Sequence, residues 1–103
     1  MAELRFHPEA ELEIDDAAWW YREQGGSELA LRFVREVRRV AALIGENPRI
    51  GRELQLEGVE VRCFATQTFP YCVVYSPDES VYILAVAHQR RRPVYWLDRL
   101  RSR

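Results

Sequence analysis

Residues 71–87, YCVVYSPDESVYILAVA, are the part of the chain that decides the fold. Two apolar runs at 71–75 and 81–87 flank the segment SPDES at 76–80. β-Branched and aromatic residues favour strands, and proline followed by aspartate favours a tight turn. The sequence therefore predicts a β-hairpin. Because the second run is apolar at almost every position, we expect it to be an internal strand that is covered on both faces.

Two further stretches extend this predicted sheet. Residues 59–65 alternate in polarity, and so do residues 2–6, AELRF, which predict a short N-terminal strand. We expect the segment before the first of these strands, PRIGRELQLEG at 48–58, to be a loop.

Two amphipathic helices are predicted between the N-terminal strand and this loop. The first runs from about Pro8 to Gln24 and follows His7, which we expect to cap it. The second begins near Ser27 and ends before Asn47-Pro48. The connection Gly25-Gly26 is short, so the two helices predict an antiparallel hairpin. Their apolar stripes recur every three or four residues, at Ala10, Ile14, Ala17 or Ala18, Tyr21, Ala30, Phe33 or Val34, Val37, Val40 or Ala41, and Ile44.

The order of elements predicts the fold class. A strand, two helices, three strands and a short C-terminal helix at about 94–101 give an α+β protein, in which the helical hairpin packs on a small, mainly antiparallel, twisted sheet. A chain of 103 residues fills one domain, so we expect residues 1–103 to form a single unit.

Composition and charge exclude several classes of protein. The chain is 48% hydrophobic and 30% charged, and no apolar run reaches the roughly 20 residues of a membrane span. The acidic N-terminus is unlike a signal peptide, so we expect a cytoplasmic protein without a membrane partner. The net charge of -1 argues against a simple polycationic nucleic-acid binder, but residues 88–103 hold six arginines and one acid.

The available side chains limit the possible chemistry. There is no lysine, and arginine is a poor proton acceptor, so acid–base chemistry must come from histidine, tyrosine or carboxylates. Cys63 and Cys72 lack zinc-ligand spacing, and we expect no metal and no cofactor. We expect both thiols to be reduced and packed within strands, with a redox role as the alternative.

The most informative stretch for function is 85–96, AVAHQRRRPVYW, where a buried strand leads into three arginines and two aromatic residues. The arginines can bind phosphate and the rings can stack on a base, or the segment is a solvated basic turn whose aromatics pack on the core. His88 is either a general acid or base or a structural hydrogen-bonding group. Tyr95 can transfer a proton only if the arginines lower its pKa, and packing is the simpler role for Trp96.

Consecutive aromatic residues mark the first helix at Trp19, Trp20 and Tyr21. Three successive positions span about 200° of a helix surface, so all three rings cannot face one core. Either at least one ring contacts a partner, or the core rim or the C-terminal tail covers it.

Taken together, these features resemble the RelE/ParE superfamily, the toxin components of type II toxin–antitoxin modules, which are also called plasmid stabilisation proteins. The resemblance is carried by Ala17–Tyr21 in the acidic helix, NPRIGREL from Asn47, FPYCVVY from Phe69, and HQRRRP from His88 followed by Tyr95-Trp96. It implies a helical hairpin on a small twisted sheet. It also implies an antitoxin from the same operon whose C-terminal segment wraps the toxin, and we expect Trp19, Trp20, Tyr95 and Trp96 to contact it.

The resemblance leaves the target open, because RelE-like members cleave mRNA on the ribosome and ParE-like members inhibit DNA gyrase. The mRNA interferase branch implies catalytic roles for Arg62, Arg91, Tyr95 and His88. That branch uses loop lysines that have no counterpart here, since Arg49 and Arg52 can bind phosphate but hardly accept protons.

The missing lysines and the net acidic charge favour the gyrase inhibitor. In that case the target-binding or phosphate-binding residues are Arg49, Arg52, Arg90, Arg91 and Arg92. A third possibility is a relative that binds an antitoxin without being toxic.

Overall fold

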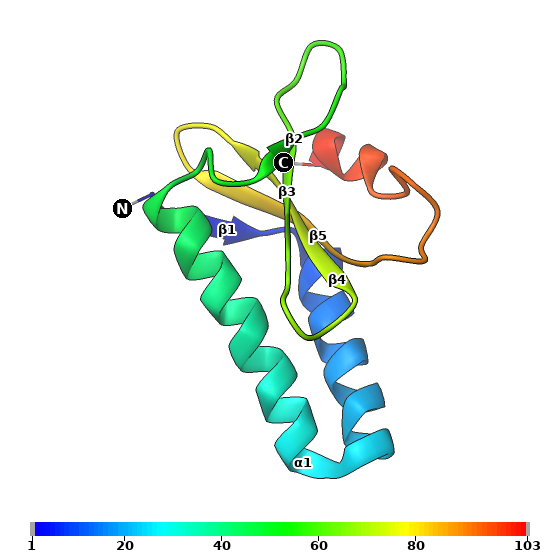
Figure 1. The fold of residues 1–103 in the computed structure, drawn as a ribbon. Coiled ribbons are helices and arrows are strands. Elements are labelled where there is room, and N and C mark those ends of the chain that lie inside the picture. The colour runs from blue at the N-terminus through cyan, green and yellow to red at the C-terminus, as the bar shows by residue number, and fades with distance from the viewer. Residues whose placement is uncertain (1, 103) are drawn as a thin grey trace.

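The computed structural model of the chain describes residues 2–102. Figure 1 shows a long helical hairpin that extends from one end of a small sheet. The elements, in chain order, are β1 (Leu4–Phe6), α1 (Pro8–Glu46), β2 (Arg52–Glu53), β3 (Arg62–Ala65), β4 (Tyr71–Pro77), β5 (Val81–His88) and the 3₁₀ helix η1 (Leu97–Ser102). Within residues 2–102, no helix has an apolar stretch long enough to cross a bilayer.

The sheet has the strand order β1-β5-β4-β3-β2. Strand β1 is parallel to β5, and all other neighbouring strands are antiparallel. The predicted α+β class and mainly antiparallel sheet are therefore confirmed, and β5 is the internal strand that its apolar sequence indicates.

The prediction of a loop throughout residues 48–58 is wrong, because this segment contains β2. In β2, Arg52 pairs with Cys63 and Glu53 pairs with Arg62. Two exposed charged residues carry no strand periodicity, so only the neighbouring strand decides that they pair. The predicted strand at 59–65 is also shorter than expected, because β3 begins at Arg62.

Helix α1 is divided at Gly26, which has a φ of 87° and lies outside helical geometry. This left-handed conformation is readily adopted by glycine, and the chain reverses there into two antiparallel arms (Figure 1). The predicted hairpin is thus confirmed. His7 caps the first arm, since its Nδ1 accepts a hydrogen bond from the backbone N–H of Glu9 at 3.0 Å. The second arm ends at Glu46 with Asn47 as its C-cap.

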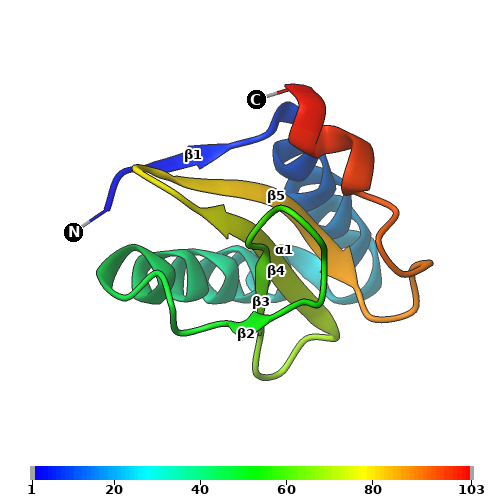
Figure 2. The same ribbon diagram turned by 90° about the horizontal axis from the view of Figure 1, so that it is seen from above.

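The two faces of the sheet have separate apolar clusters, and Figure 2 shows the hairpin beneath the sheet. On the hairpin face, the buried stripe of α1 packs against Val73, Tyr75, Ile83 and Val86. On the opposite face, the C-terminal segment and the loop after β2 pack against the sheet through Trp96, Tyr95, Leu100, Leu54 and Leu56.

The C-terminal helix differs from the prediction of residues 94–101. It begins at Leu97 and has 3₁₀ geometry. Val94 has a φ of 52°, a left-handed conformation that a β-branched residue rarely adopts and that interrupts any regular helix. The residues between β5 and η1 therefore form turns that carry the chain back across the sheet.

Candidate functional site

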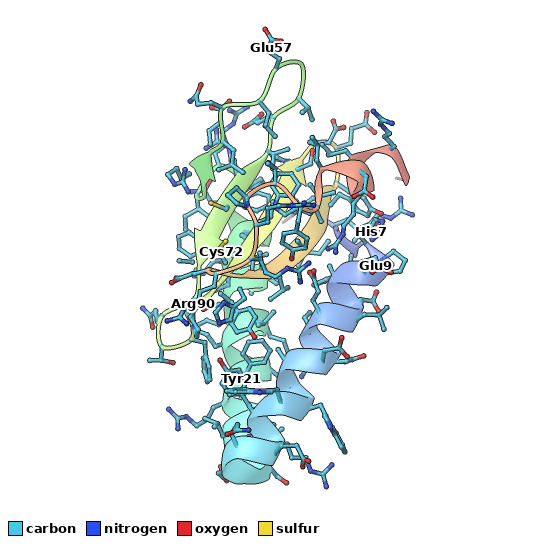
Figure 3. The ribbon with its side chains drawn as sticks, turned by 90° about the vertical axis from the view of Figure 1, so that its right-hand side faces the viewer. His7, Glu9, Tyr21, Glu57, Cys72 and Arg90 are labelled. Carbon is cyan, nitrogen blue, oxygen red and sulfur yellow. The ribbon has the colours of Figure 1, made fainter. Side chains whose placement is uncertain are left out.

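A groove of about 460 Å³ lies on the sheet face opposite the hairpin. The loop around Arg52–Leu56 forms one wall and residues 88–96 form the other. Figure 3 shows Cys72 and Arg90 on this side of the molecule, near the crossing C-terminal segment. The floor is made by sheet residues Cys63, Cys72, Val74 and Ala87. We refer below to the whole groove, with its two walls and its floor, as the basic groove.

The basic groove brings together several residues that the sequence singles out. Its lining includes Arg52, His88, Arg91, Arg92 and Tyr95, which come from β2, the end of β5 and the C-terminal segment. Arg90 is exposed beside the groove, although it does not line it. Arginine side chains grouped in a concave surface favour binding of carboxylates or phosphates.

His88 is fixed by local structure at the end of β5. Its Nδ1 accepts a hydrogen bond from the backbone N–H of Arg90 at 3.0 Å. Its ring also packs edge-on against Tyr71, with the centroids 5.0 Å apart. His88 therefore makes a structural hydrogen bond, which is one of the two roles that we considered for it from the sequence.

Tyr95 does not have the lowered pKa that proton transfer would require. Its hydroxyl donates a hydrogen bond to Oε2 of Glu13 at 2.6 Å. Burial and then the Glu13 carboxylate raise the pKa of Tyr95, and together they outweigh the opposing effect of Arg91 and Arg99. The guanidinium of Arg91 instead stacks on the Tyr95 ring at 3.8 Å from its centroid.

Glu13 is the site residue that the sequence analysis missed. Its carboxylate accepts hydrogen bonds from Val86 N at 2.9 Å, from the Tyr95 hydroxyl, and from Arg99 Nη2 at 3.0 Å. Arg99 also donates to the carbonyl of Leu84 at 3.0 Å. This network fixes the C-terminal wall of the basic groove to α1 and β5. Its spacing could have indicated this role. Glu13 is three residues after the buried Ala10 and four before the buried Ala17, so it lies on the same face of the helix as both.

Arg62 is separated from the basic groove. It pairs with Tyr75 in register, whereas its neighbour Cys63 lines the groove, so the two side chains point to opposite faces of the sheet. The Arg62 side chain is only 13% exposed and bonds to Glu60 at 2.7 Å and to the Gly51 carbonyl at 2.8 Å. The structure therefore does not join Arg62 to His88, Arg91 and Tyr95.

Arg49 is also outside the basic groove. It is exposed in the loop after α1, with its guanidinium 3.8 Å from the Glu60 carboxylate. Of the two loop arginines predicted to bind phosphate, only Arg52 lines the groove.

The predicted partner aromatics differ in exposure. Trp19 and Trp20 are 59% and 56% exposed, whereas Tyr21 is buried against Phe33 and Phe69. Trp96 is 4% exposed and belongs to the core cluster on the groove face. The contact with a partner that we predicted for Trp96 therefore lacks an exposed side chain. The ring packs in the core instead, which is the simpler role that the sequence indicated.

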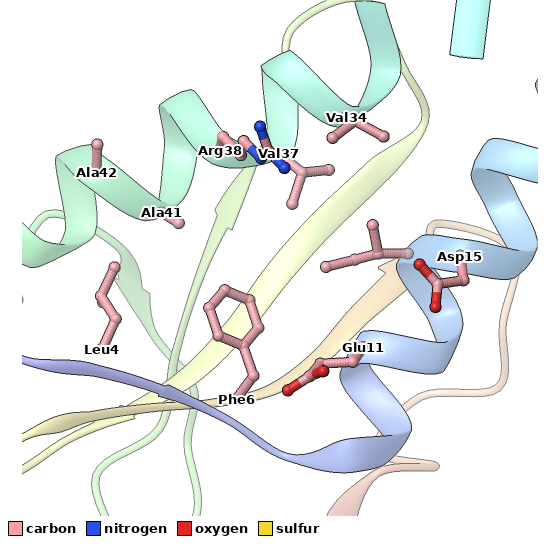
Figure 4. Close-up of a pocket in the computed structure, with 10 residues that line it drawn as sticks. Leu4, Phe6, Glu11, Asp15, Val34, Val37, Arg38, Ala41 and Ala42 are labelled. Atoms are coloured by element: carbon pink, nitrogen blue, oxygen red, sulfur yellow. The ribbon is translucent and has the colours of Figure 1, made fainter. Parts of the chain in front are cut away.

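A second groove, of about 530 Å³, lies between the arms of α1 and β1 (Figure 4). Its walls are mainly apolar, and Glu11, Asp15 and Arg38 contribute charge. Trp19 follows Asp15 by one helical turn on the same face of the first arm. We refer to this as the hairpin groove. Its apolar lining residues are Leu4, Phe6, Ile14, Val34, Val37, Ala41 and Ala42.

Neither groove contains an evident metal site. Across residues 2–102, no three histidine, cysteine, aspartate or glutamate side chains gather closely enough to hold a metal ion. Cys63 and Cys72 are free and half-buried, and thus less enclosed than their apolar surroundings in the sequence suggest.

The sequence profile described as "ParE toxin of type II toxin-antitoxin system, parDE" matches residues 4–93. Because this match covers most of the chain, the protein belongs to the ParE family of type II toxins. The resemblance inferred from the sequence motifs is thereby confirmed.

Comparison with solved structures agrees at the level of the fold. The chain is similar to a chain in the structure of the chromosomal ParDE TA system from P. aeruginosa, with a TM-score of 0.73 and 21% sequence identity. The similarity covers 85% of this chain and 96% of that chain. No curated protein sequence gives a significant match.

Proposed function

We propose that this protein is a cytoplasmic toxin that inhibits DNA gyrase and is neutralised by a cognate antitoxin. The observation that carries the proposal is the match of residues 4–93 to the ParE toxin family. The basic groove is the target-binding surface in this proposal, because it presents Arg52, Arg91 and Arg92 in one concavity. Inhibition by binding requires complementary shape and charge but no proton transfer.

The distribution of site residues supports binding over ribonuclease chemistry. Cleavage of mRNA through the ribose 2′-OH needs a base and an acid near one phosphate. The Tyr95 hydroxyl is already bonded to Glu13, and Arg62 is held by Glu60 on the opposite face of the sheet. Among the residues that the mRNA interferase branch implies, this leaves His88 as the acid–base group that lines the basic groove.

Pulse labelling after induction of the chain alone tests the target. We expect DNA synthesis to fall before protein synthesis, and we expect the purified protein to block supercoiling by gyrase. An earlier fall in protein synthesis, with cleavage of mRNA on translating ribosomes, contradicts the proposal and supports the mRNA interferase alternative. Normal growth supports the third possibility, a non-toxic relative.

Two variants test whether the basic groove carries the activity. The double substitution Arg91→Ala with Arg92→Ala should weaken gyrase inhibition by about tenfold or more, since each charged contact is worth roughly 1.5–3 kcal/mol. Arg35→Ala, at an exposed position on α1, is the matched control. Tyr95→Phe should barely reduce inhibition, and a loss of about a hundredfold would argue that its hydroxyl takes part in chemistry.

The hairpin groove is the surface that we assign to the antitoxin. An amphipathic helix can place its apolar face against the groove wall formed by Phe6, Ile14 and Val34. Exposed Trp19, on the same face as Asp15, extends this surface toward the end of the hairpin. Trp20 points to the other side, where it lines a smaller hollow with His88 and Arg91.

Co-purification with the product of the neighbouring gene tests the antitoxin assignment. Ala42 is exposed at the edge of the hairpin groove, so Ala42→Glu places a charge there without disturbing the core. We expect antitoxin binding to weaken by about tenfold or more, because the introduced carboxylate loses hydration when it is covered. Leu31→Glu, at an exposed position outside the groove, is the control. Equal weakening by both variants contradicts the assignment.

A further inference from the structure

Cys63 and Cys72 are diagonal neighbours on one face of the sheet. In the register of β3 and β4, Cys63 pairs with Val74 and Ala65 pairs with Cys72. Paired residues and residues two apart share a face, so both thiols point to the same side. That side is the basic groove, whose floor contains both cysteines.

One cationic side chain contacts this thiol pair, and two further arginines line the same groove. Nη2 of Arg52 on β2 donates a hydrogen bond to Sγ of Cys63 at 3.3 Å. From the C-terminal side, His88, Arg91 and Arg92 line the same groove. A cationic donor beside a sulfur stabilises the thiolate, which is the nucleophilic form of cysteine.

The two thiols differ in acidity. The hydrogen bond from Cys72, followed by the charge of Arg52, lowers the pKa of Cys63 to about 6 against the opposing effect of burial. The hydrogen bond that Cys72 makes to Cys63, and then burial, raise the pKa of Cys72. The Arg52 guanidinium bonds to Cys63, and this geometry favours Cys63 as the thiolate and Cys72 as the thiol that donates to it.

We propose that Cys63 and Cys72 form a redox-reactive dithiol site, in which Cys63 reacts with a hydroperoxide and Cys72 then closes a disulfide. The groove opens both sulfurs to a small oxidant, since each residue is half-buried and lines its floor. This inference concerns the thiols alone and holds whether or not gyrase is the target.

The chemistry proceeds in two balanced steps. The Cys63 thiolate attacks the terminal oxygen of the hydroperoxide, so an S–O bond forms, the O–O bond breaks, and the leaving alkoxide or hydroxide takes a proton from water. Sulfur is oxidised to a sulfenic acid and the peroxide is reduced. The Cys72 sulfur then attacks Cys63 Sγ, the S–O bond breaks, and the released hydroxide combines with the Cys72 proton to form water.

Closing the disulfide requires a small movement of the strands. Diagonal neighbours across an antiparallel pair have Cα atoms about 7–8 Å apart, slightly beyond the usual span of a disulfide. Strand β3 has four residues, all paired with β4, and on its other side it is bordered only by the two-residue β2, so a shift of β3 carries few further backbone pairs with it.

Mass spectrometry after hydrogen peroxide treatment tests the site. In the wild-type protein we expect an intramolecular disulfide, with a mass loss of two hydrogens that dithiothreitol reverses. Cys72→Ser keeps a hydrogen-bond donor beside Cys63 but removes the resolving thiol, so a sulfenic acid should accumulate at Cys63 and react with dimedone. Cys63→Ser should react at least about tenfold more slowly, because its remaining thiol is at the more buried of the two positions and lacks the hydrogen bond from Arg52 that Cys63 accepts.

Arg52→Ala and Arg49→Ala form a matched pair that tests the charge effect. Arg52→Ala should slow sulfenic acid formation by a few fold, whereas Arg49→Ala, which removes an arginine outside the groove, should leave the rate unchanged. Alkylation of the wild-type thiols gives a measurement that needs no variant, and the rate at Cys63 should rise with a midpoint near pH 6.

Three outcomes overturn the proposal. They are equal peroxide reactivity of the Cys63→Ser and Cys72→Ser proteins, a wild-type protein that forms only disulfides between molecules, and a Cys63 alkylation midpoint near that of an ordinary thiol at about pH 8.5.

Discussion

The two faces of the sheet are covered in different ways. On one face, α1 forms a continuous apolar interface in which Phe33, Val40 and Ile44 are fully buried. On the other face, the C-terminal segment covers only part of the sheet and buries Trp96, while Cys63 and Cys72 stay half-buried. The first face is closed by periodic apolar packing, and the second is held in part by a polar network on Glu13.

The buried contacts of α1 contribute free energy to folding but leave no space for a ligand. On that side, a partner has room only in the hairpin groove beside these contacts, between the two arms of α1 and β1. A segment fixed at a few polar points leaves a basic groove whose arginines remain available to a partner. Substitutions on the two faces should therefore change the free energy of unfolding by different amounts.

The largest effect is expected on the hairpin face. Phe33→Ala should lower the free energy of unfolding by about 3–5 kcal/mol, because it removes a fully buried ring and leaves a cavity. Urea unfolding measures this change. The exposed Leu31→Ala on the same arm should stay within about 0.5 kcal/mol of wild type. A loss below about 1 kcal/mol for Phe33→Ala would show that the two faces do not differ in this way.

The next effect tests the network on the groove face. Glu13→Gln removes the charge that pairs with the largely buried Arg99, and we expect a loss of about 2–3 kcal/mol. Amide hydrogen exchange should speed up mainly in residues 95–102, since these depend on Glu13 for attachment. Asp16→Asn, at an exposed position on the same arm, serves as the control. Unchanged exchange in 95–102 would contradict a fixing role for Glu13.

The dependence of the unfolding free energy on pH tests the raised pKa of Tyr95 on the groove face. Burial, and then Glu13, raise the pKa of Tyr95 in the folded state, so its stabilising effect is complete below pH 10. Above that pH the unfolded chain releases the tyrosine proton and the folded chain retains it. The unfolding free energy of the wild type should therefore fall more steeply than that of Tyr95→Phe, by up to about 1.4 kcal/mol per pH unit. Parallel curves above pH 10 would contradict the raised pKa.

The smallest effect is expected at the surface of α1. Arg39 makes two hydrogen bonds to Glu36, at 2.9 and 2.8 Å, in a pair one helical turn apart in which the arginine side chain is 42% exposed. Arg39→Ala should cost only about 0.3–0.5 kcal/mol, because solvent weakens such pairs. Glu36 keeps its bond to the N–H of Gln67 in the variant. A loss above about 1.5 kcal/mol would show that this pair acts like the buried network.

Local signals in the sequence predicted the hairpin face well. The apolar stripe, His7 before Pro8, and Gly25-Gly26 each act within one or two helical turns, so neighbouring residues suffice to indicate them. The same holds for the turn between β4 and β5. Strand β2 and the positive φ of Val94 had no such local signal, since both depend on neighbours distant in the sequence.

The candidate site was predicted only in part. The motif from His88 to Trp96 indicated the basic segment, and His88, Arg91, Arg92 and Tyr95 do line one groove with Arg52. The alternation of residues 59–65 puts Arg62 and Cys63 on opposite faces of a strand, but only the structure shows which of these faces carries the basic groove. For Trp96 the sequence indicated packing as the simpler role and a partner contact as the alternative, and the path of the C-terminal segment across the sheet decides for packing.

Residue patterns alone were enough to predict the main helices and strands in their order, the apolar surfaces that must be buried, and the family to which the protein belongs. Which charged groups are available to a partner follows only from the folded structure. Glu13 shows the reason, since it bonds to Tyr95 from 82 residues away and raises the pKa of that hydroxyl. Hydrophobic periodicity is a short-range property of a chain, whereas the environment of a polar group depends on the residues that folding places around it.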